Sequence, residues 1–142
     1  MYLVSIVLFI VFLILSVSIW SMATLYVDLP SLVLIITFTV PILFASGLHK
    51  DFLKGIKLMR SKENLYSAIE LKRMLQAVKL VIKTTLLSGI LGSLLGTIAI
   101  LSNGTFLFEH FAVAMIALLY AIIFVLILLP IEARIKATID TF

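Results

Sequence analysis

The side chains whose types and spacing best suit a chemical function lie in the apolar stretch Lys83–Leu101. Small and hydroxyl-bearing residues recur there at helical spacing. They form two adjacent rows, one of Thr85, Gly89, Ser93 and Thr97 and the other of Ser88, Gly92 and Gly96. On a helix these rows merge into one face, opposite a face of leucine and isoleucine. Such a face lets membrane helices pack closely, and its hydroxyls could also line a polar lumen. The spacing leaves both interpretations open.

A second stripe of small residues lies in the last apolar stretch of the chain. His110, Ala114, Ala117 and Ala121 fall on one helical face, which is suited to meet the first stripe. Glu109 and His110 at its start invite a metal site or a proton relay. Two side chains are too few to hold a metal ion, so we predict no metal site.

The chain lacks the combinations of side chains that most enzymes need. It contains no cysteine, which excludes a thiolate metal site, a disulfide and a cysteine nucleophile. It has no Ser-His-Asp arrangement and no phosphate-binding loop, and no general base stands beside the hydroxyls of Lys83–Leu101. We therefore predict that the protein is not an enzyme and uses no cofactor.

Composition places these residues in a membrane. The chain is 63% hydrophobic and 13% charged, with a mean hydropathy of +1.31, whereas a soluble domain is roughly half apolar and a quarter charged. A helix crosses a bilayer with about 20 apolar residues. Four stretches are long enough: Tyr2–Met22, Ser31–Leu48, Lys83–Leu101 and Phe111–Pro130. The predicted fold is an all-α integral membrane protein, a single four-span domain over residues 1–142.

The first apolar stretch has features of a signal peptide, because Ser21-Met22-Ala23 looks like a cleavage site. No positively charged segment precedes it, however, and its apolar run exceeds the roughly 7–15 residues of a signal sequence. We predict a retained membrane helix.

Basic residues lie on one side of the predicted spans. Nine of the eleven Lys and Arg fall within His49–Lys83, and the other two follow the last stretch. The loops 21–30 and 102–110 contain none. Because cytoplasmic loops carry the excess of positive charge, we predict that residues 49–83 and both termini are cytoplasmic.

The basic segment 49–82 has its own helical periodicity. We expect helical extensions of the second and third stretches that form a short hairpin below the membrane, with a break at residues 60–64 and caps at Ser61 and Asn64. The basic face either binds anionic lipid headgroups or is simply solvated. Its place beside the spans argues for membrane lipids as partners and against nucleic acid.

No carboxylate lies within any of the four stretches. Ionisable residues inside a membrane are the usual markers of an ion or proton path. If protons cross this protein, another subunit must supply the group that titrates.

Short motifs in these stretches resemble, in the same order, those of the flagellar-motor protein MotA and its relatives TolQ and ExbB. Asp28, Pro30 and Ser31 match the D-x-P-S start of the second MotA span, and Asp51–Lys54 is similar to the sequence that follows that span. Gly89, Gly92, Ser93 and Gly96 resemble the G-x-x-G-T-x-x-G pattern shared by the three proteins. The end of MotA is matched by Ala112-Val113-Ala114, Tyr120 and Leu129-Pro130-Ile131.

The chain also departs from this family pattern. Between its second and third spans MotA has a large domain that engages the rotor, whereas this chain has only the 49–83 segment. Ser93 replaces the threonine of the family's third span, and Ala117-Leu118 stands where the last span has a threonine pair.

The resemblance implies a ring of five subunits around two single-span helices of a MotB- or ExbD-like partner, in the bacterial inner membrane. The partner would bring the aspartate that this chain lacks. Ser93 and Thr97 would face the lumen, and Ala117 would pack at or beside it. Helix packing would fall to Thr85, Gly89, Gly92, Gly96, Ala114 and Ala121.

The leading hypothesis is thus a MotA-like subunit of an ion-driven rotary channel, with the proton as the expected ion. The alternative is a non-conducting homo-oligomeric scaffold or accessory protein with a MotA-like fold. A small four-span drug transporter would suit the size of the chain, but such transporters use a membrane-embedded glutamate, which no stretch here contains.

Overall fold

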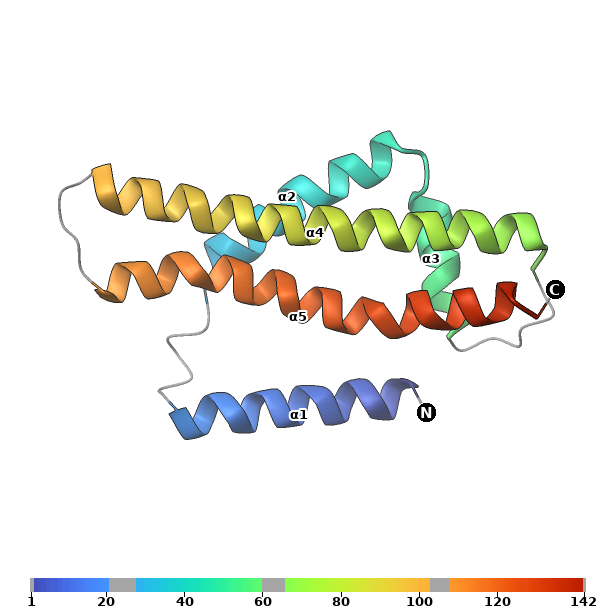
Figure 1. Cartoon of the computed structure of the whole chain (residues 1–142), viewed down its shortest axis with the longest axis horizontal. Helices are drawn as coiled ribbons and strands as arrows, with labels where there is room; N and C mark the ends of the chain where they lie inside the picture. The colour runs from blue at the N-terminus through green and yellow to red at the C-terminus, as the bar shows by residue number, and fades with distance from the viewer. Residues whose placement is uncertain (1, 21–27, 60–65, 103–107, 142) are drawn as a thin grey trace.

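The structure, a computed structural model, describes residues 2–20, 28–59, 66–102 and 108–141. These residues form five helices and no strand (Figure 1). The helices are α1 (Tyr2–Trp20), α2 (Leu29–Ala45), α3 (His49–Leu58), α4 (Ala68–Ser102) and α5 (Phe108–Ile139). The long helices α4 and α5 run antiparallel along each other, α2 crosses them obliquely, and the short α3 crosses them near the end that holds the C-terminus. The prediction of an all-α fold is confirmed.

Two of the helices are suited to a bilayer. α4 and α5 are long and apolar enough to cross a membrane, and α2 and α3 pass the same test only as one bent pair. α1 is 19 residues long and contains no charged side chain. The described part of the chain therefore holds two helices that could cross a membrane, or three if the bent pair is one span, and this supports a membrane protein.

α2 begins at a cap that its sequence encodes. The backbone N–H of Ser31 donates a hydrogen bond of 3.0 Å to Asp28 Oδ2, and Pro30 occupies the first turn. A side-chain acceptor before a helix satisfies a backbone N–H group that has no partner within the helix. Proline is tolerated in the first turn because it has no N–H group that would need such a partner. The D-x-P-S motif is therefore a helix start.

The chain turns by 106° between α2 and α3. Gly47 lies in the left-handed region at φ 69°, which glycine adopts without a steric penalty. Its N–H donates to the carbonyl of Phe44 at 3.0 Å, and the Ser46 hydroxyl accepts from the N–H of Leu48 at 3.3 Å. The expected extension of the second apolar stretch is thus a separate helix that turns away from it.

α4, in contrast, runs for 35 residues from the basic segment into the apolar stretch without a break. A capping box starts it: the Ser67 hydroxyl accepts from the N–H of Glu70 at 3.3 Å, and the Glu70 carboxylate accepts from the N–H of Ser67 at 3.2 Å. The predicted caps Ser61 and Asn64 lie outside the described residues. α5 likewise continues through Pro130 as far as Ile139.

The buried core lies where α3 crosses α4 and α5. It is formed by Leu58, Leu71, Met74, Val78, Ile131 and Ile135. Gly55 lets α3 come close, because a Cβ atom at this position would lie 3.3 Å from Ile135 Cδ1 and 3.4 Å from Val78 Cγ2. Further along α4 the large apolar side chains point outward, with Leu87 64% and Leu94 56% exposed. Lipid tails are as apolar as leucine, so a bilayer accepts such a surface.

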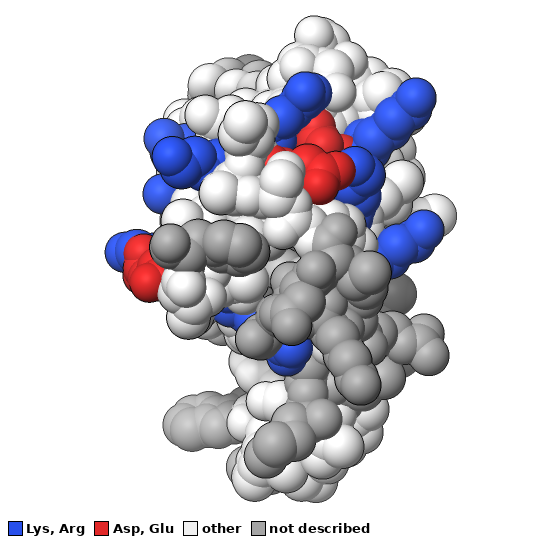
Figure 2. All heavy atoms as spheres, turned by 90° about the vertical axis from the view of Figure 1, so that its right-hand side faces the viewer, with Lys and Arg blue, Asp and Glu red and all other residues white. Residues whose placement is uncertain are grey.

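Charge is concentrated at the same end as this core. Lysine and arginine side chains surround a few carboxylates in the end-on view (Figure 2). At the other flank of the molecule, α1 lies beside α5, where Ser5, Ile6 and Phe9 share a cavity of about 130 Å³ with Leu126, Ile127 and Pro130.

Candidate functional site

The two predicted stripes of small residues meet each other within one chain. A Cβ atom added to Gly89 would lie 2.3 Å from Ala121 Cβ, and one added to Gly96 would lie 2.9 Å from Ala114 Cβ. Carbon atoms in contact are ordinarily about 3.5–4.0 Å apart, so only glycine fits at these positions. The backbones of α4 and α5 approach closely because neither helix places a larger side chain between them. We call this contact the α4–α5 seam.

Gly92 lies at the middle of the α4–α5 seam. A Cβ atom there would lie 3.0 Å from Ala117 Cβ and 3.1 Å from a methyl group of Leu34, so α2 closes the seam from one side. Ala117 is only 3% exposed and faces Gly92. The residue expected at or beside a lumen is therefore enclosed between the helices of its own chain.

The hydroxyl groups of α4 between Thr84 and Thr97 fall into two sets. Ser88 and Thr84 are buried, and their hydroxyls donate to backbone carbonyls one turn earlier, at 2.7 Å to Thr84 and 3.0 Å to Leu80. Such bonds satisfy the hydroxyl inside its own helix. Thr85 is also buried, at 3% exposure. These three hydroxyls are structural groups of the packed bundle.

Ser93 and Thr97 form the second set, and both are half-buried. The Ser93 hydroxyl points across to α5 and lies 3.3 Å from Met115 Sδ. The Thr97 hydroxyl donates to the carbonyl of Ser93 at 2.8 Å. The exposed Met115 belongs to a wholly apolar groove along α5, with a volume of about 400 Å³. Of the three residues expected to line a lumen, these two keep partial access to the surface of the chain.

Two motifs that are far apart in the sequence come together at the start of α2. The backbone N–H of Asp28 donates to the Tyr120 hydroxyl at 3.0 Å, and the Ser31 hydroxyl donates to the Asp28 carboxylate. Tyr120 lies on α5, so this bond fixes the N-terminal end of α2 against the last helix. Pro130 is not part of this group and lies inside α5 next to α1.

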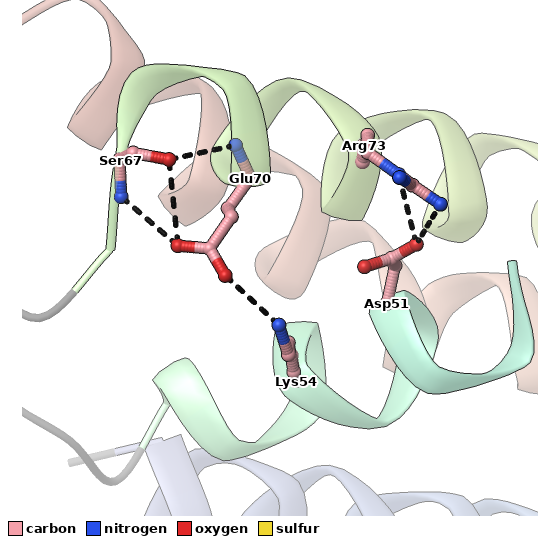
Figure 3. A network of polar contacts seen from close by, with 5 residues as sticks. All are labelled: Asp51, Lys54, Ser67, Glu70 and Arg73. Carbon is pink, nitrogen blue, oxygen red and sulfur yellow. Dashed lines mark hydrogen bonds and ion pairs between the residues drawn. The ribbon is translucent and has the colours of Figure 1, made fainter.

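A polar network joins α3 to α4 below the seam (Figure 3). The Arg73 guanidinium contacts Asp51 Oδ2 through both Nε and Nη2, each at 3.2 Å. The Asp51 residue is only 7% exposed. One turn away, Lys54 Nζ lies 2.9 Å from Glu70 Oε1. Each of the two helices thus contributes one carboxylate and one basic side chain to the contact.

The second ion pair shifts the titration of both partners. Hydrogen bonds from the Lys54 ammonium and from the backbone N–H of Ser67 hold the pKa of Glu70 below its ordinary value of 4.5. The hydrogen bond to the Glu70 carboxylate raises the pKa of Lys54 above 10.5. Both side chains are exposed to water, which screens the pair and limits its contribution to stability.

A cavity of about 200 Å³ lies between α2, α4 and α5, with Phe52 of α3 also in its lining. Its lining is apolar apart from Thr39 and Thr85. The Thr39 hydroxyl oxygen is buried without a hydrogen-bond partner. The sequence had drawn attention to Thr85 as part of the small face, but it gave no sign of a cavity.

Metal binding has no support in the described part of the chain, where no three His, Asp or Glu side chains come together. The side chains of Glu109 and His110 lie outside that part.

Sequence inspection missed the contacts that organise the charged end. The S-x-x-E spacing of Ser67 and Glu70 is a readable signal for a capping box. The pairing of Asp51 with Arg73 has no such signal, because it depends on the turn between α2 and α3.

No protein-family model matches this chain, and no curated protein or solved structure matches it significantly either.

Proposed function

We propose that this protein is a ring-forming membrane subunit of an ion-driven, proton-using rotary complex, similar in plan to MotA. Its four apolar stretches would span the bacterial inner membrane with both termini in the cytoplasm. Five copies would surround a single-span partner, which would carry the intramembrane aspartate. The five-fold count, the partner and the cellular location come from the sequence resemblance.

The observation that best supports this proposal is how the small face of α4 is divided. Gly89, Gly92 and Gly96 pack against α5 in the α4–α5 seam. Ser93 and Thr97 stay half-buried beside it. The accessible Ser93 hydroxyl on this rigid hairpin would supply a polar group to a lumen, while the enclosed glycines serve packing.

The seam also changes what a bulky substitution would report. Gly92 contacts Ala117 and Leu34 of its own chain. Gly92→Leu would therefore disrupt the fold of the subunit before it affected the ring, so ring assembly is better measured on the unaltered protein. Native mass measurement of the complex extracted from its own membrane should give five copies of this chain plus two copies of a single-span partner.

Proton flux into vesicles that contain a pH-sensitive dye tests the function. The protein alone should leave vesicles proton-tight, because the apolar parts of α2, α4 and α5 contain no Asp, Glu or His side chain. The complex with its partner should conduct. Ser93→Ala should lower that flux several-fold, and Leu94→Ala, on the exposed side of α4, should leave it unchanged.

The scaffold remains the second candidate, and the enclosure of Ala117 favours it. The threonine pair of MotA is replaced here by Ala117-Leu118. The last helix therefore provides no hydroxyl group opposite Gly92. A scaffold predicts the same ring without proton flux, with or without a partner. Steady conduction by the protein alone would contradict both proposals.

A further inference from the structure

The short helix α3 has an outward side that nothing in the described part of the chain covers. Asp51, Gly55 and Leu58 are buried against α4 and α5. On the opposite side Leu53 is 56% exposed and Ile56 is 38% exposed. Two large apolar side chains on the outer face of a short, charged helix need a partner or a solvent that accepts them.

The two flanks of α3 differ in chemistry, and the contacts of the helix fix their directions. Phe52 lines the cavity that also contains Thr39 and Val81, so its flank faces the apolar part of the bundle. Ile56 is one turn further along the same flank. Lys54 on the other flank reaches Glu70 in the first turn of α4, away from the apolar part (Figure 3).

Two more lysines share the flank of Lys54. Lys50 and Lys57 stand four residues before it and three residues after it, and both are exposed. Neither forms an ion pair with another described residue, whereas Asp51 and Glu70 are already paired with Arg73 and Lys54. α3 therefore presents uncompensated positive charge next to an apolar edge.

The position of α3 along α4 matches the headgroup layer of a bilayer. Gly55 packs against Val78, five residues before Lys83, where the apolar stretch begins. At 1.5 Å per residue this is about 8 Å. The polar layer on each side of the hydrocarbon is of the same order, about 5–8 Å. The 106° turn after α2 lays α3 across the bundle at this level.

We propose that α3 is a membrane-surface helix that docks on anionic phospholipid headgroups. Leu53 and Ile56 would enter the boundary of the acyl chains, while Lys50 and Lys57 would contact lipid phosphates. Amphipathic helices bind at this depth through buried apolar area together with attraction to anionic lipid. The proposal rests on the membrane placement given above, and it does not require ion conduction.

The absence of cysteine allows the depth of α3 to be measured with single spin labels. Leu53→Cys and Ile56→Cys would be labelled in the full-length protein in vesicles, and collisions with oxygen and with a water-soluble nickel chelate would be compared. Both positions should lie at or just below the phosphates. Lys72→Cys should report water, and Leu94→Cys should report the hydrocarbon interior.

Lipid charge tests the role of the two lysines. When phosphatidylglycerol replaces phosphatidylcholine, label 53 should move deeper into the bilayer. The ratio of docked to undocked α3 should rise about fivefold for each lysine. Lys50→Gln with Lys57→Gln should abolish this dependence, while the matched pair Lys72→Gln with Lys136→Gln should retain it. Inorganic phosphate added to phosphatidylcholine vesicles should have no effect on the depth of the label.

Three results would overturn the inference. Label 53 could prove as accessible to nickel as label 72, the lipid dependence could survive in the Lys50 and Lys57 double variant, or free phosphate could replace the anionic lipid. Accessibility of label 94 to nickel would instead contradict the membrane placement itself. Failure of the lipid-docking proposal can therefore be distinguished from failure of the membrane placement.

Discussion

The α4–α5 seam predicts that a single added methyl group destabilises the protein. In Gly89→Ala the new Cβ atom would lie 2.3 Å from Ala121 Cβ and 3.0 Å from the carbonyl oxygen of Ala117. Restoring ordinary contact, at about 3.7 Å, requires the helices to move apart by about 1.4 Å. The nearest obstacle is a methyl group fixed to a helix backbone, so no rotamer change can relieve the clash.

The expected cost follows from two opposing effects. Overpacking of this kind costs about 1–3 kcal/mol, while alanine gains about 0.5–1 kcal/mol over glycine in the interior of a helix. Because the obstructing methyl group cannot move aside, the upper part of the overpacking range applies, about 2–3 kcal/mol. The net loss should then be about 1–2.5 kcal/mol, or a factor of about 5–70 in the folding equilibrium. Gly96→Ala, whose nearest contact is 2.9 Å from Ala114 Cβ, should lose less.

Equilibrium unfolding in mixed micelles, followed by helical circular dichroism, measures this cost. Leu94→Ala on the exposed side of α4 serves as the control for general effects of substitution. Combining Gly89→Ala with Ala121→Gly moves the methyl group from one helix to the other and should restore part of the loss, because the Ala117 carbonyl oxygen stays close. Comparing the wild type, the two single variants and the double variant in a double-mutant cycle isolates the interaction between positions 89 and 121. A Gly89→Ala variant as stable as the wild type would refute the close approach of α4 and α5.

Three further predictions concern the charged end and the orientation of α4 in the membrane. Arg73→Met should cost about 1–3 kcal/mol because it leaves the buried Asp51 carboxylate unpaired, whereas the exposed neighbour Lys72→Met should have little effect on the same unfolding curve. The attachment of α3 to α4, followed by hydrogen exchange of the α3 amides, should weaken in acid below pH 4.5. The reason is that Glu70 has a lowered pKa and stabilises the folded state only while it is ionised; Glu70→Gln should remove this dependence, and an unchanged acid profile in that variant would assign it to another group. Cysteines at Lys72 and Ser102 should react with an impermeant thiol reagent from opposite sides of the membrane, and labelling of position 72 from outside intact cells would reverse the proposed topology.

The membrane character of the chain and the presence of long helices could be predicted from the sequence alone. Apolar stretches of sufficient length and residues at helical spacing are local properties, which do not depend on what packs against them. The start of α2 was readable for the same reason, because Asp28, Pro30 and Ser31 form a cap within four consecutive residues. The S-x-x-E signal before α4 was equally local and could have been found.

Only the tertiary structure decided which groups are used for packing and which stay accessible. Spacing placed seven small residues on one face of α4, but the contact with α5 separated the enclosed Gly89 from the half-buried Ser93. The direction of α3 was likewise beyond sequence patterns, because it depends on a backbone turn at Gly47. That turn brings Asp51 to Arg73, on a helix whose own sequence carries no sign of the pairing. Periodicity defines the faces of a helix, whereas its neighbours in space determine what each face contacts.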